Sequence, residues 1–284
     1  MQERKSAFFI LGILFGLNIL AWNIVYGFGI SDFLEVTFFD VGQGDAVLIE
    51  TGHSHQVLID GGPDSVILEK LGREMPFWDR TIDLIILTHP ERDHIAGLLE
   101  VLKRYEVENI LWTGVLRDTA EFREWEKSIK EEGAKIIIAR KSLKIDLDNS
   151  YIDILHPLES LEGREIKNSN NTSIVAKLVF GENSFLFIGD IEKSVEKELA
   201  EGKAGIDSDV LKIAHHGSKT SSAPEFIEKV SPEIAVISVG QNNLYGHPYP
   251  ETLETLAKYG INVLRTDEVG DIKILCNSQF LKLK

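Results

Sequence analysis

The residues best suited to chemistry lie in the run 88–97, THPERDHIAG, which holds two histidines and two carboxylates. The run follows a short apolar segment that is typical of a buried strand. Alternate side chains of an extended loop point to the same side, so His89, Glu91 and Asp93 can converge while His94 starts a helix. Imidazole and carboxylate donors without a thiolate suit zinc or manganese. The alternative, a charged loop in which Asp93 caps the helix, does not account for histidines at both ends.

Four further groups of chemically capable residues also follow apolar, strand-like segments. They are Asp60, Asp190, the pair His215 and His216, and His247. Taken singly, each has an ordinary explanation as a helix cap, a turn residue or a core residue. Together with the run 88–97, they place five of the eight histidines in strand-end loops, where a rigid scaffold usually carries its functional residues. His53, His55 and His156 are interpreted as structural.

Composition limits the classes of protein that this chain can represent. Hydrophobic residues make up 43% and charged residues 26% of the 284 residues, which is ordinary for a globular protein. The net charge of −15 argues against a basic surface that binds DNA without sequence preference, but not against a substrate held mainly by metal ions. The single cysteine, Cys276, excludes an intramolecular disulfide and a thiolate zinc cluster, and we expect it in a buried strand.

The N-terminal segment differs from the rest. Residues 7–26 are almost entirely apolar and long enough to cross a bilayer as a helix. Trp22 and Tyr26 stand where an interfacial aromatic belt is expected. Arg4 and Lys5 precede the span, which predicts a cytoplasmic N-terminus.

The sequence therefore predicts a single-pass protein of the cell membrane, with a membrane anchor at 1–30 and a globular domain at 31–284 outside the cytoplasm. A cleaved signal peptide is the alternative. No clear cleavage site follows the span, although Gly27 and Gly29 leave cleavage open.

Hydrophobic patterning of the remaining chain predicts an α/β domain with two blocks of strands followed by helices. Expected strands fall at 34–40, 46–50, 56–60, 83–87, 110–112, 134–138, 143–147, 151–155, 173–180, 184–188, 209–214, 233–239, 262–264 and 271–275, and expected helices at 95–105, 119–132, 191–200, 224–229 and 250–259. The last two strands are assigned to the second block. Two such blocks indicate a four-layer αββα sandwich. The polar segment 159–171 is the expected mobile loop.

The ordered motifs resemble the metallo-β-lactamase superfamily, whose pattern is His-x-His-x-Asp-His, a later Asp and a final His. Within it, residues 33–276 are most similar to the C-terminal hydrolase domain of ComEC-type DNA-uptake proteins. The segments that carry the resemblance are FDVGQGDA at 39–46, LIDGG at 58–62, residues 89–97, NNTS at 170–173, GD at 189–190, HHGSKTSS at 215–222 and RTD at 265–267. The resemblance implies the same αββα fold.

The resemblance also implies two divalent metal ions, zinc or manganese. His89 and Glu91 are assigned to one ion, Asp93, His94 and His216 to the other, and Asp190 to a bridging position. His215 is the alternative to His216, and otherwise contacts the substrate.

The implied activity is phosphodiester hydrolysis, with DNA as the expected substrate. Two ions activate a water between them and stabilise charge on the phosphoryl oxygens, and Asp93 orients that water. Ser218, Lys219 and Thr220 are expected to contact a phosphate, and His247 to protonate the leaving oxygen. A phosphodiesterase acting on a cell-envelope polymer and a metal-binding, non-catalytic assembly module are the alternatives.

The chain departs from the family pattern at three places. Glu91 stands where the ComEC-type domains usually have Asp, and Ala96 replaces a usual glycine. The histidine that many members use as a third ligand of the first ion has no counterpart, and Asn171 stands nearest in order. The first ion is therefore expected to be weakly held or completed by water.

Overall fold

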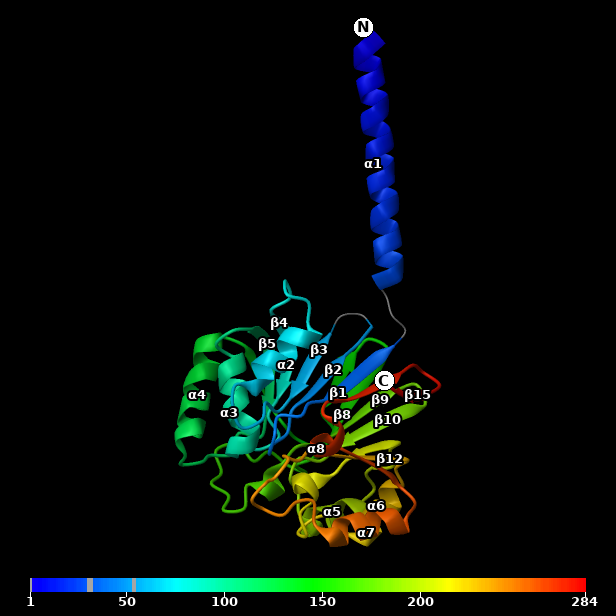
Figure 1. Ribbon diagram of the computed structural model, residues 1–284. Helices are drawn as coiled ribbons and strands as arrows, with labels where there is room; N and C mark the ends of the chain where they lie inside the picture. Colours follow the sequence, from blue (N-terminus) through cyan, green and yellow to red (C-terminus); the bar gives the residue numbers. More distant parts are fainter. Residues whose placement is uncertain (1, 30–32, 53–54) are drawn as a thin grey trace.

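The computed structural model describes residues 2–29, 33–52 and 55–284 (Figure 1). The N-terminal segment forms helix α1 (Gln2–Gly29), and the side chains described in it, at 8–21, are exposed. Within the described part of the chain, no helix combines the length and apolar character required of a membrane span. The side chains of Arg4, Lys5, Trp22 and Tyr26, and all of His53, lie outside the described residues. The anchor therefore stays a prediction.

Two β-sheets form the centre of the domain. The first sheet has the order β15-β14-β1-β2-β3-β4-β5-β6, and the second has the order β13-β12-β11-β10-β9-β8-β7. The strands of the first are β1 (Leu34–Phe38), β2 (Val47–Glu50), β3 (Gln56–Ile59), β4 (Thr81–Ile86), β5 (Glu106–Trp112), β6 (Lys135–Ile138), β14 (Ile272–Cys276) and β15 (Leu281–Leu283). Those of the second are β7 (Lys144–Leu147), β8 (Ser150–His156), β9 (Val175–Phe180), β10 (Asn183–Phe187), β11 (Val210–Lys212), β12 (Ile234–Ile237) and β13 (Asn262–Arg265).

Helices cover the outer face of each sheet, which confirms the αββα sandwich (Figure 1). The first sheet carries α2 (Val66–Glu74), α3 (Arg92–Val101) and α4 (Ala120–Glu132), and the second carries α5 (Lys193–Glu201), α6 (Pro224–Val230) and α7 (Pro250–Lys258). Between the sheets, Phe38 and Phe187 pack at 6.0 Å between ring centroids, among other buried aliphatic side chains. Both sheets therefore bury apolar residues on both faces, as the near-continuous apolar strand segments require.

Local sequence signals account for the helix ends. Thr119 caps α4 by accepting a hydrogen bond from the Phe122 amide, and Gly133 ends it in the left-handed conformation. Helix α3 begins at Arg92 with Glu91 at its N-cap position, and no side chain caps it. The alternative reading of Asp93 as a cap is therefore wrong.

The prediction for the C-terminal strand needs a correction. The segment expected at 271–275 in the second block is β14, which pairs antiparallel with β1 in the first sheet, with Leu34 opposite Cys276. Cys276 is buried there, as expected. Two α-helices, α2 and the short α8 (Thr266–Val269), and the strand β15 were not predicted.

The polar segment 159–171 runs into a short 3-10 helix, Asn170–Thr172. Its backbone bonds to the loop after β5, where the Leu116 amide donates to Arg164 at 2.9 Å. Its mobility stays a prediction.

Strand direction brings the candidate residues together. Strand β2 is antiparallel to both β1 and β3, and β4 is parallel to β3, so the carboxyl ends of β1, β3 and β4 share one edge of the first sheet. Strands β10, β11 and β12 are mutually parallel in the second sheet. The loops that follow these ends in both sheets meet and carry the motifs identified in the sequence.

Candidate metal centre

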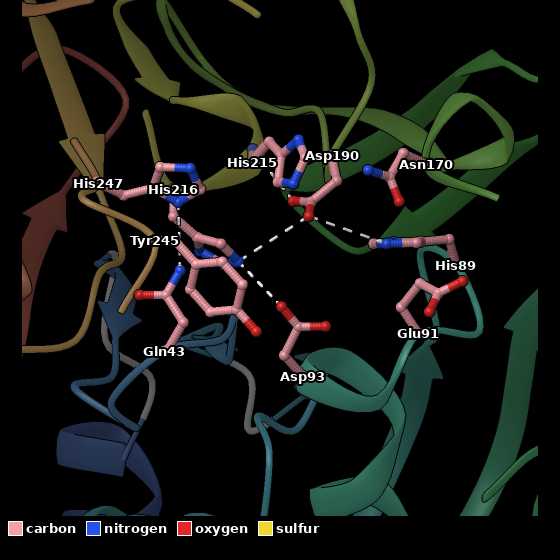
Figure 2. Close-up of a pocket in the computed structure, with 10 residues that line it drawn as sticks. All are labelled: Gln43, His89, Glu91, Asp93, Asn170, Asp190, His215, His216, Tyr245 and His247. Atoms are coloured by element: carbon pink, nitrogen blue, oxygen red, sulfur yellow. Dashed lines mark hydrogen bonds and ion pairs between the residues drawn. The ribbon is translucent and has the colours of Figure 1, made fainter. Parts of the chain in front are cut away.

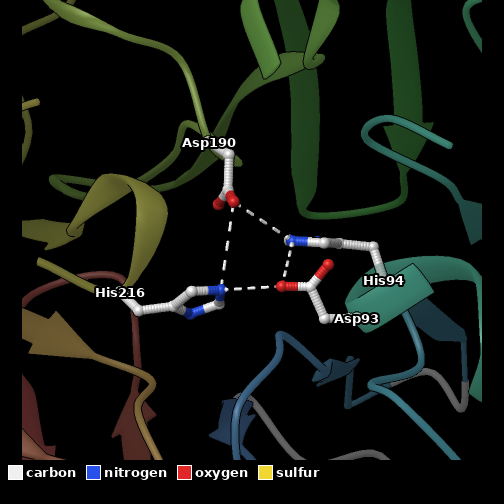
Figure 3. Close-up of side chains that lie close together, drawn as sticks. All are labelled: Asp93, His94, Asp190 and His216. Carbon is white, nitrogen blue, oxygen red and sulfur yellow. Dashed lines mark hydrogen bonds and ion pairs between the residues drawn. The ribbon is translucent and has the colours of Figure 1, made fainter. Parts of the chain in front are cut away.

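Four side chains converge at this edge from three segments that follow strand ends, two of them from the first turn of α3 (Figure 3). They are Asp93, His94, Asp190 and His216, and one ligand atom of each lies within 4.8 Å of the others. Asp190 Oδ2 is 3.5 Å from His94 Nε2 and 3.9 Å from His216 Nε2. Asp93 Oδ2 is 3.2 Å from His216 Nε2. Two imidazole nitrogens and two carboxylates around a common centre form a donor set for a divalent ion.

Asp60 fixes the orientation of His94. Its Oδ2 lies 2.8 Å from His94 Nδ1, and it also accepts from the amide and hydroxyl of Thr88 at 2.8 and 2.7 Å. Because His94 Nδ1 faces this carboxylate, the ring presents Nε2 to the cluster. A carboxylate behind a metal-binding histidine sets its tautomer and increases its basicity.

His216 is held by its backbone and by its Nδ1 atom. Both His215 and His216 adopt left-handed backbone angles, with φ of 52° and 54°, which is uncommon for residues other than glycine. His216 Nδ1 bonds to the Ser238 carbonyl at 2.8 Å and lies 3.4 Å from Asp45 Oδ1. Asp45 is paired in turn with the buried Lys212 at 2.5 Å. Such strained conformations persist where surrounding contacts determine them, frequently at functional sites.

His89 stands beside the four-residue cluster. Its Nε2 is 3.9 Å from Asp190 Oδ2 (Figure 2). Its ring centroid is 4.2 Å from that of His94. The Nε2 atoms of His89 and His94 are both buried without a hydrogen-bond partner. Buried polar atoms are normally satisfied, so two orphaned imidazole nitrogens next to one carboxylate fit a divalent metal.

The charge of the cluster supports the same conclusion. Burial opposes ionisation of Asp190, yet His94 and His216 hold the pKa of that carboxyl well below its usual value. Burial likewise opposes protonation of His216, yet Asp190 helps raise its pKa to about 10. Burial and His94 together lower the pKa of His89 to about 3. The carboxylates therefore stabilise positive charge at the centre, and a bound metal ion can supply that charge in place of protons on the imidazole rings.

Glu91 lines the same pocket but is not part of the four-residue cluster. Its Oε1 accepts a hydrogen bond from Arg117 at 2.6 Å and a second one from the Ser169 hydroxyl. The structure therefore pairs the residue predicted as a first-ion ligand with a guanidinium. Its ligand role stays a prediction.

Only some of the residues predicted to contact the substrate line the pocket. His215 and His247 line the pocket, with ring centroids 5.7 Å apart (Figure 2). Ser218 is buried, and its hydroxyl bonds to that of Thr220 at 3.0 Å. Lys219 and Thr220 are exposed on the same loop, and neither lines the pocket.

His247 is half-buried and is the partner of Gln43, whose Nε2 lies 3.5 Å from His247 Nδ1. Burial lowers the pKa of His247 to about 4, with a further contribution from His216 and His215. Its ring is therefore neutral at neutral pH. This charge state does not suit the predicted role of proton donor to a leaving group.

Sequence reasoning missed three lining residues, Gln43, Asn170 and Tyr245. Gln43 and Asn170 lie in motifs that carried the family resemblance, which was the available signal, whereas Tyr245 lies outside them. Asn171, the residue nearest in order to the missing histidine, points elsewhere: its amide Nδ2 donates to Glu192 at 3.3 Å.

The histidines interpreted as structural have partners away from the pocket. His55 bridges Asp83 and Asp148 at 3.4 and 3.0 Å, and the buried His156 bonds through Nδ1 to the Ser173 carbonyl at 3.0 Å. Both interpretations agree with the structure.

Comparison with known proteins gives a family match over most of the chain. The sequence model described as "Metallo-beta-lactamase superfamily" matches residues 39–241. The chain is 33% identical to "ComE operon protein 3" of Bacillus subtilis (strain 168), with 84% of this chain and 32% of that protein covered. It is 32% identical to "Competence protein ComA" of Neisseria gonorrhoeae, again with 84% and 32% covered. The chain thus spans about a third of the length of these relatives.

Among solved structures, the metallo-β-lactamase fold protein YhfI of Bacillus subtilis superposes with a TM-score of 0.57 at 15% identity. The match covers 89% of this chain and 100% of that one. At this identity the likeness concerns the fold alone.

Proposed function

Because the chain belongs to the metallo-β-lactamase superfamily, we propose that it is a metal-dependent phosphodiesterase that acts on nucleic acid. The observation that carries the proposal is the convergence of the half-buried Asp93 with the buried His94, Asp190 and His216 beside a pocket. A competence protein among the relatives supports a nucleic-acid substrate.

In this proposal, the four-residue cluster would hold one divalent ion. His89 would hold a second ion together with Asp190, which is thus shared by both. Zinc and manganese both suit these donors. Bound ions supply a water of lowered pKa and stabilise the charge that develops on phosphoryl oxygens. Glu91 is engaged by Arg117, so the second position has fewer protein donors than the first.

The side chains around the cluster have separate roles. The Asp93 side chain is 34% exposed, whereas that of Asp190 is 4% exposed, so Asp93 is the carboxylate that can orient a water from the pocket. His247 is neutral at neutral pH, and we assign it a hydrogen bond to the leaving oxygen rather than proton delivery. His215 lines the pocket next to His247 and can contact a phosphate oxygen. Lys219 and Thr220 remain candidates for a more distant phosphate.

The activity test uses purified protein and bis-p-nitrophenyl phosphate, with manganese or zinc added after chelator treatment. We expect metal-dependent hydrolysis that is lost in Asp190→Ala and His94→Ala, together with the metal found by elemental analysis. His55→Ala is the matched control, because His55 also contacts carboxylates but lies away from the pocket. Full metal retention in both cluster variants would refute the ligand set. Metal binding without hydrolysis of any phosphodiester would favour a non-catalytic module.

The proposed location is the cell membrane, with the globular domain outside the cytoplasm. Helix α1 exposes large apolar side chains, including Phe8, Phe9 and Phe15, and exposed apolar patches of this kind normally have a partner. The aromatic pair Phe77 and Trp78 is also exposed, at 81% and 73%. It precedes β4 and therefore lies at the edge where β1 begins, opposite the pocket.

The location test is fractionation of the full-length protein. We expect it to remain in the membrane after carbonate extraction and to lose its domain to protease added outside spheroplasts. Protection of the domain until lysis would place it in the cytoplasm and would contradict the proposal.

A further inference from the structure

The rim of the pocket carries an aromatic ring that the proposed chemistry does not use. Tyr245 lines the pocket (Figure 2). It is 65% exposed, and its neighbour Leu244 is 98% exposed. One face of the Tyr245 ring rests on His247, with centroids 5.8 Å apart and planes inclined by 23°. Because so much of the residue is exposed, the other face is open to solvent beside the reaction centre.

The loop that carries Tyr245 is held in place by one side chain. Asn243 Oδ1 accepts from the amides of Tyr245 and His247 at 3.2 and 3.0 Å. Asn243 Nδ2 donates to the carbonyls of His247 and Gly240 at 2.7 and 3.1 Å. Four hydrogen bonds to one amide group fix the turn, so the exposed ring does not have to be ordered when a ligand arrives.

A second layer supports the ring from behind. His247 contacts Tyr249, with centroids 5.5 Å apart, and Gln43 approaches the same imidazole. Lys219 Nζ lies 5.3 Å from the centre of the Tyr249 ring. Tyr245 is therefore the outermost of three rings in contact: it stacks on His247, and His247 is tilted by 56° against Tyr249. The open face of the Tyr245 ring is directed away from His247.

The negative charge of the pocket lining favours contacts to nucleic acid that do not depend on a cationic side chain. Among the described residues, the pocket lining includes three carboxylates and no lysine or arginine. A phosphodiester strand that approaches this lining meets no lysine or arginine among its described residues, and the phosphate contacts proposed above outside the metal centre are limited to His215 and, farther out, Lys219 and Thr220. Stacking of a base on an aromatic ring supplies affinity that needs no cation and tolerates any base sequence.

We propose that Tyr245 is a stacking platform for the nucleobase next to the scissile phosphate, and that the ligand of this rim is single-stranded nucleic acid. The inference rests on the proposed phosphodiesterase function for its placement beside the reacting phosphate. Bases within a duplex already stack on each other, whereas those of a single strand are free to stack on protein rings. The rim therefore selects single strands and strand ends over intact duplex.

The test compares two chromogenic diesters on the full-length protein. Thymidine 5′-p-nitrophenyl phosphate carries a base, whereas methyl p-nitrophenyl phosphate carries none. We expect the ratio of kcat/KM for the thymidine ester to that for the methyl ester to fall about tenfold in Tyr245→Ala, mainly through KM, and to be kept in Tyr245→Phe. Phe77→Ala is the matched control, because it removes an exposed ring at the opposite edge of the domain.

A binding measurement makes the test independent of catalysis. Fluorescence anisotropy of labelled oligothymidylate with chelator-treated protein should show weaker binding by Tyr245→Ala and unchanged binding by Tyr245→Phe. Equal ratios and equal affinities in wild type and Tyr245→Ala would overturn the stacking role while leaving the hydrolase intact. Hydrolysis of neither ester by wild type, together with Tyr245-dependent binding, would refute the phosphodiesterase function and keep the stacking site.

Discussion

Replacing Asp60 by asparagine tests whether the residue behind His94 sets the properties of the metal centre. Asp60 has a φ of 58°, a conformation that asparagine tolerates, so the backbone gains no new strain. The carboxylate faces three donor groups, the amide and hydroxyl of Thr88 and Nδ1 of His94, at 2.7 to 2.8 Å. An asparagine side chain offers one acceptor and one NH₂ group. In either orientation of the asparagine amide, its NH₂ group therefore faces Thr88 or His94, which donate hydrogen bonds to Asp60 in the wild-type protein.

The expected magnitudes follow from that mismatch. A buried donor without an acceptor costs about 1–3 kcal/mol of folding stability. His94 also loses the carboxylate that keeps its Nε2 directed at Asp190, and disruption of such a partner typically lowers metal affinity by about 10- to 100-fold. Burial raises the pKa of Asp60 against the opposing effect of His94, so the carboxylate itself is partly destabilised and the stability loss should fall at the lower end.

Metal affinity is measured by competition with a fluorescent chelator at fixed pH, and stability by urea denaturation of the metal-free protein. Asp83→Asn is the matched control, because Asp83 also contacts a histidine ring and a backbone amide, those of His55 and Gln56, but lies outside the pocket. Metal affinity of Asp60→Asn within twofold of wild type, with the stability loss present, would refute the orienting role of Asp60.

Four further predictions follow from contacts in and around the site. Glu91→Ala should leave metal content unchanged and lower the unfolding free energy by about 1 kcal/mol, because it removes the partner of Arg117; loss of one ion in elemental analysis would instead make Glu91 a ligand. Lys212→Met should lower the free energy of unfolding, measured by urea denaturation, by about 3–5 kcal/mol, because it removes the lysine that is paired with the buried carboxylate of Asp45. The double variant with Asp45→Asn should regain most of that stability, and a loss below about 1 kcal/mol in Lys212→Met would contradict the prediction. Burial raises the pKa of Glu196 from 4.5 to about 7, so its carboxyl binds a proton more tightly in the native than in the unfolded state, and folding stability falls as pH rises from 4.5 to 7. The Glu196→Gln variant should lose this pH dependence, which is on the order of 3 kcal/mol, when denaturation is measured at pH 4.5 and at pH 7. A pH profile of stability unchanged from wild type would refute the prediction. Binding of oligothymidylate should depend weakly on salt, with a log–log slope no steeper than about −1.4, the value for two phosphate contacts; a steeper slope would reveal a basic path that the pocket lining lacks.

The sequence alone determined the layers of the fold and the edge that carries the chemistry. Apolar runs of strand length and amphipathic helices depend on residues close together in the chain, so their patterning was sufficient to predict most elements and the αββα order. The same local signal placed His89, His94, Asp190 and His216 after buried strands. Because parallel strands end at one edge, convergence of these side chains was predictable in kind.

Tertiary structure decided which side chains actually meet. Strand β14 joined the first sheet because its partner is β1, more than 200 residues earlier, and no local pattern encodes that pairing. Glu91 met Arg117 from the loop after β5, although its spacing from His89 matched the family's ligand motif. A side chain's partner depends on how separate segments are packed, and not on spacing within one segment.

Support of the imidazoles was likewise a tertiary result. Asp60 appeared in the sequence as one more strand-end carboxylate, yet it lies behind His94 and not among the clustered donors. The contact of His216 with Asp45 joins loops of the two different sheets and therefore depends on how the sheets pack. Sequence thus supplied the donor types and their edge, whereas their orientation and pKa values required the packed core, because burial and neighbouring charge exist only after folding.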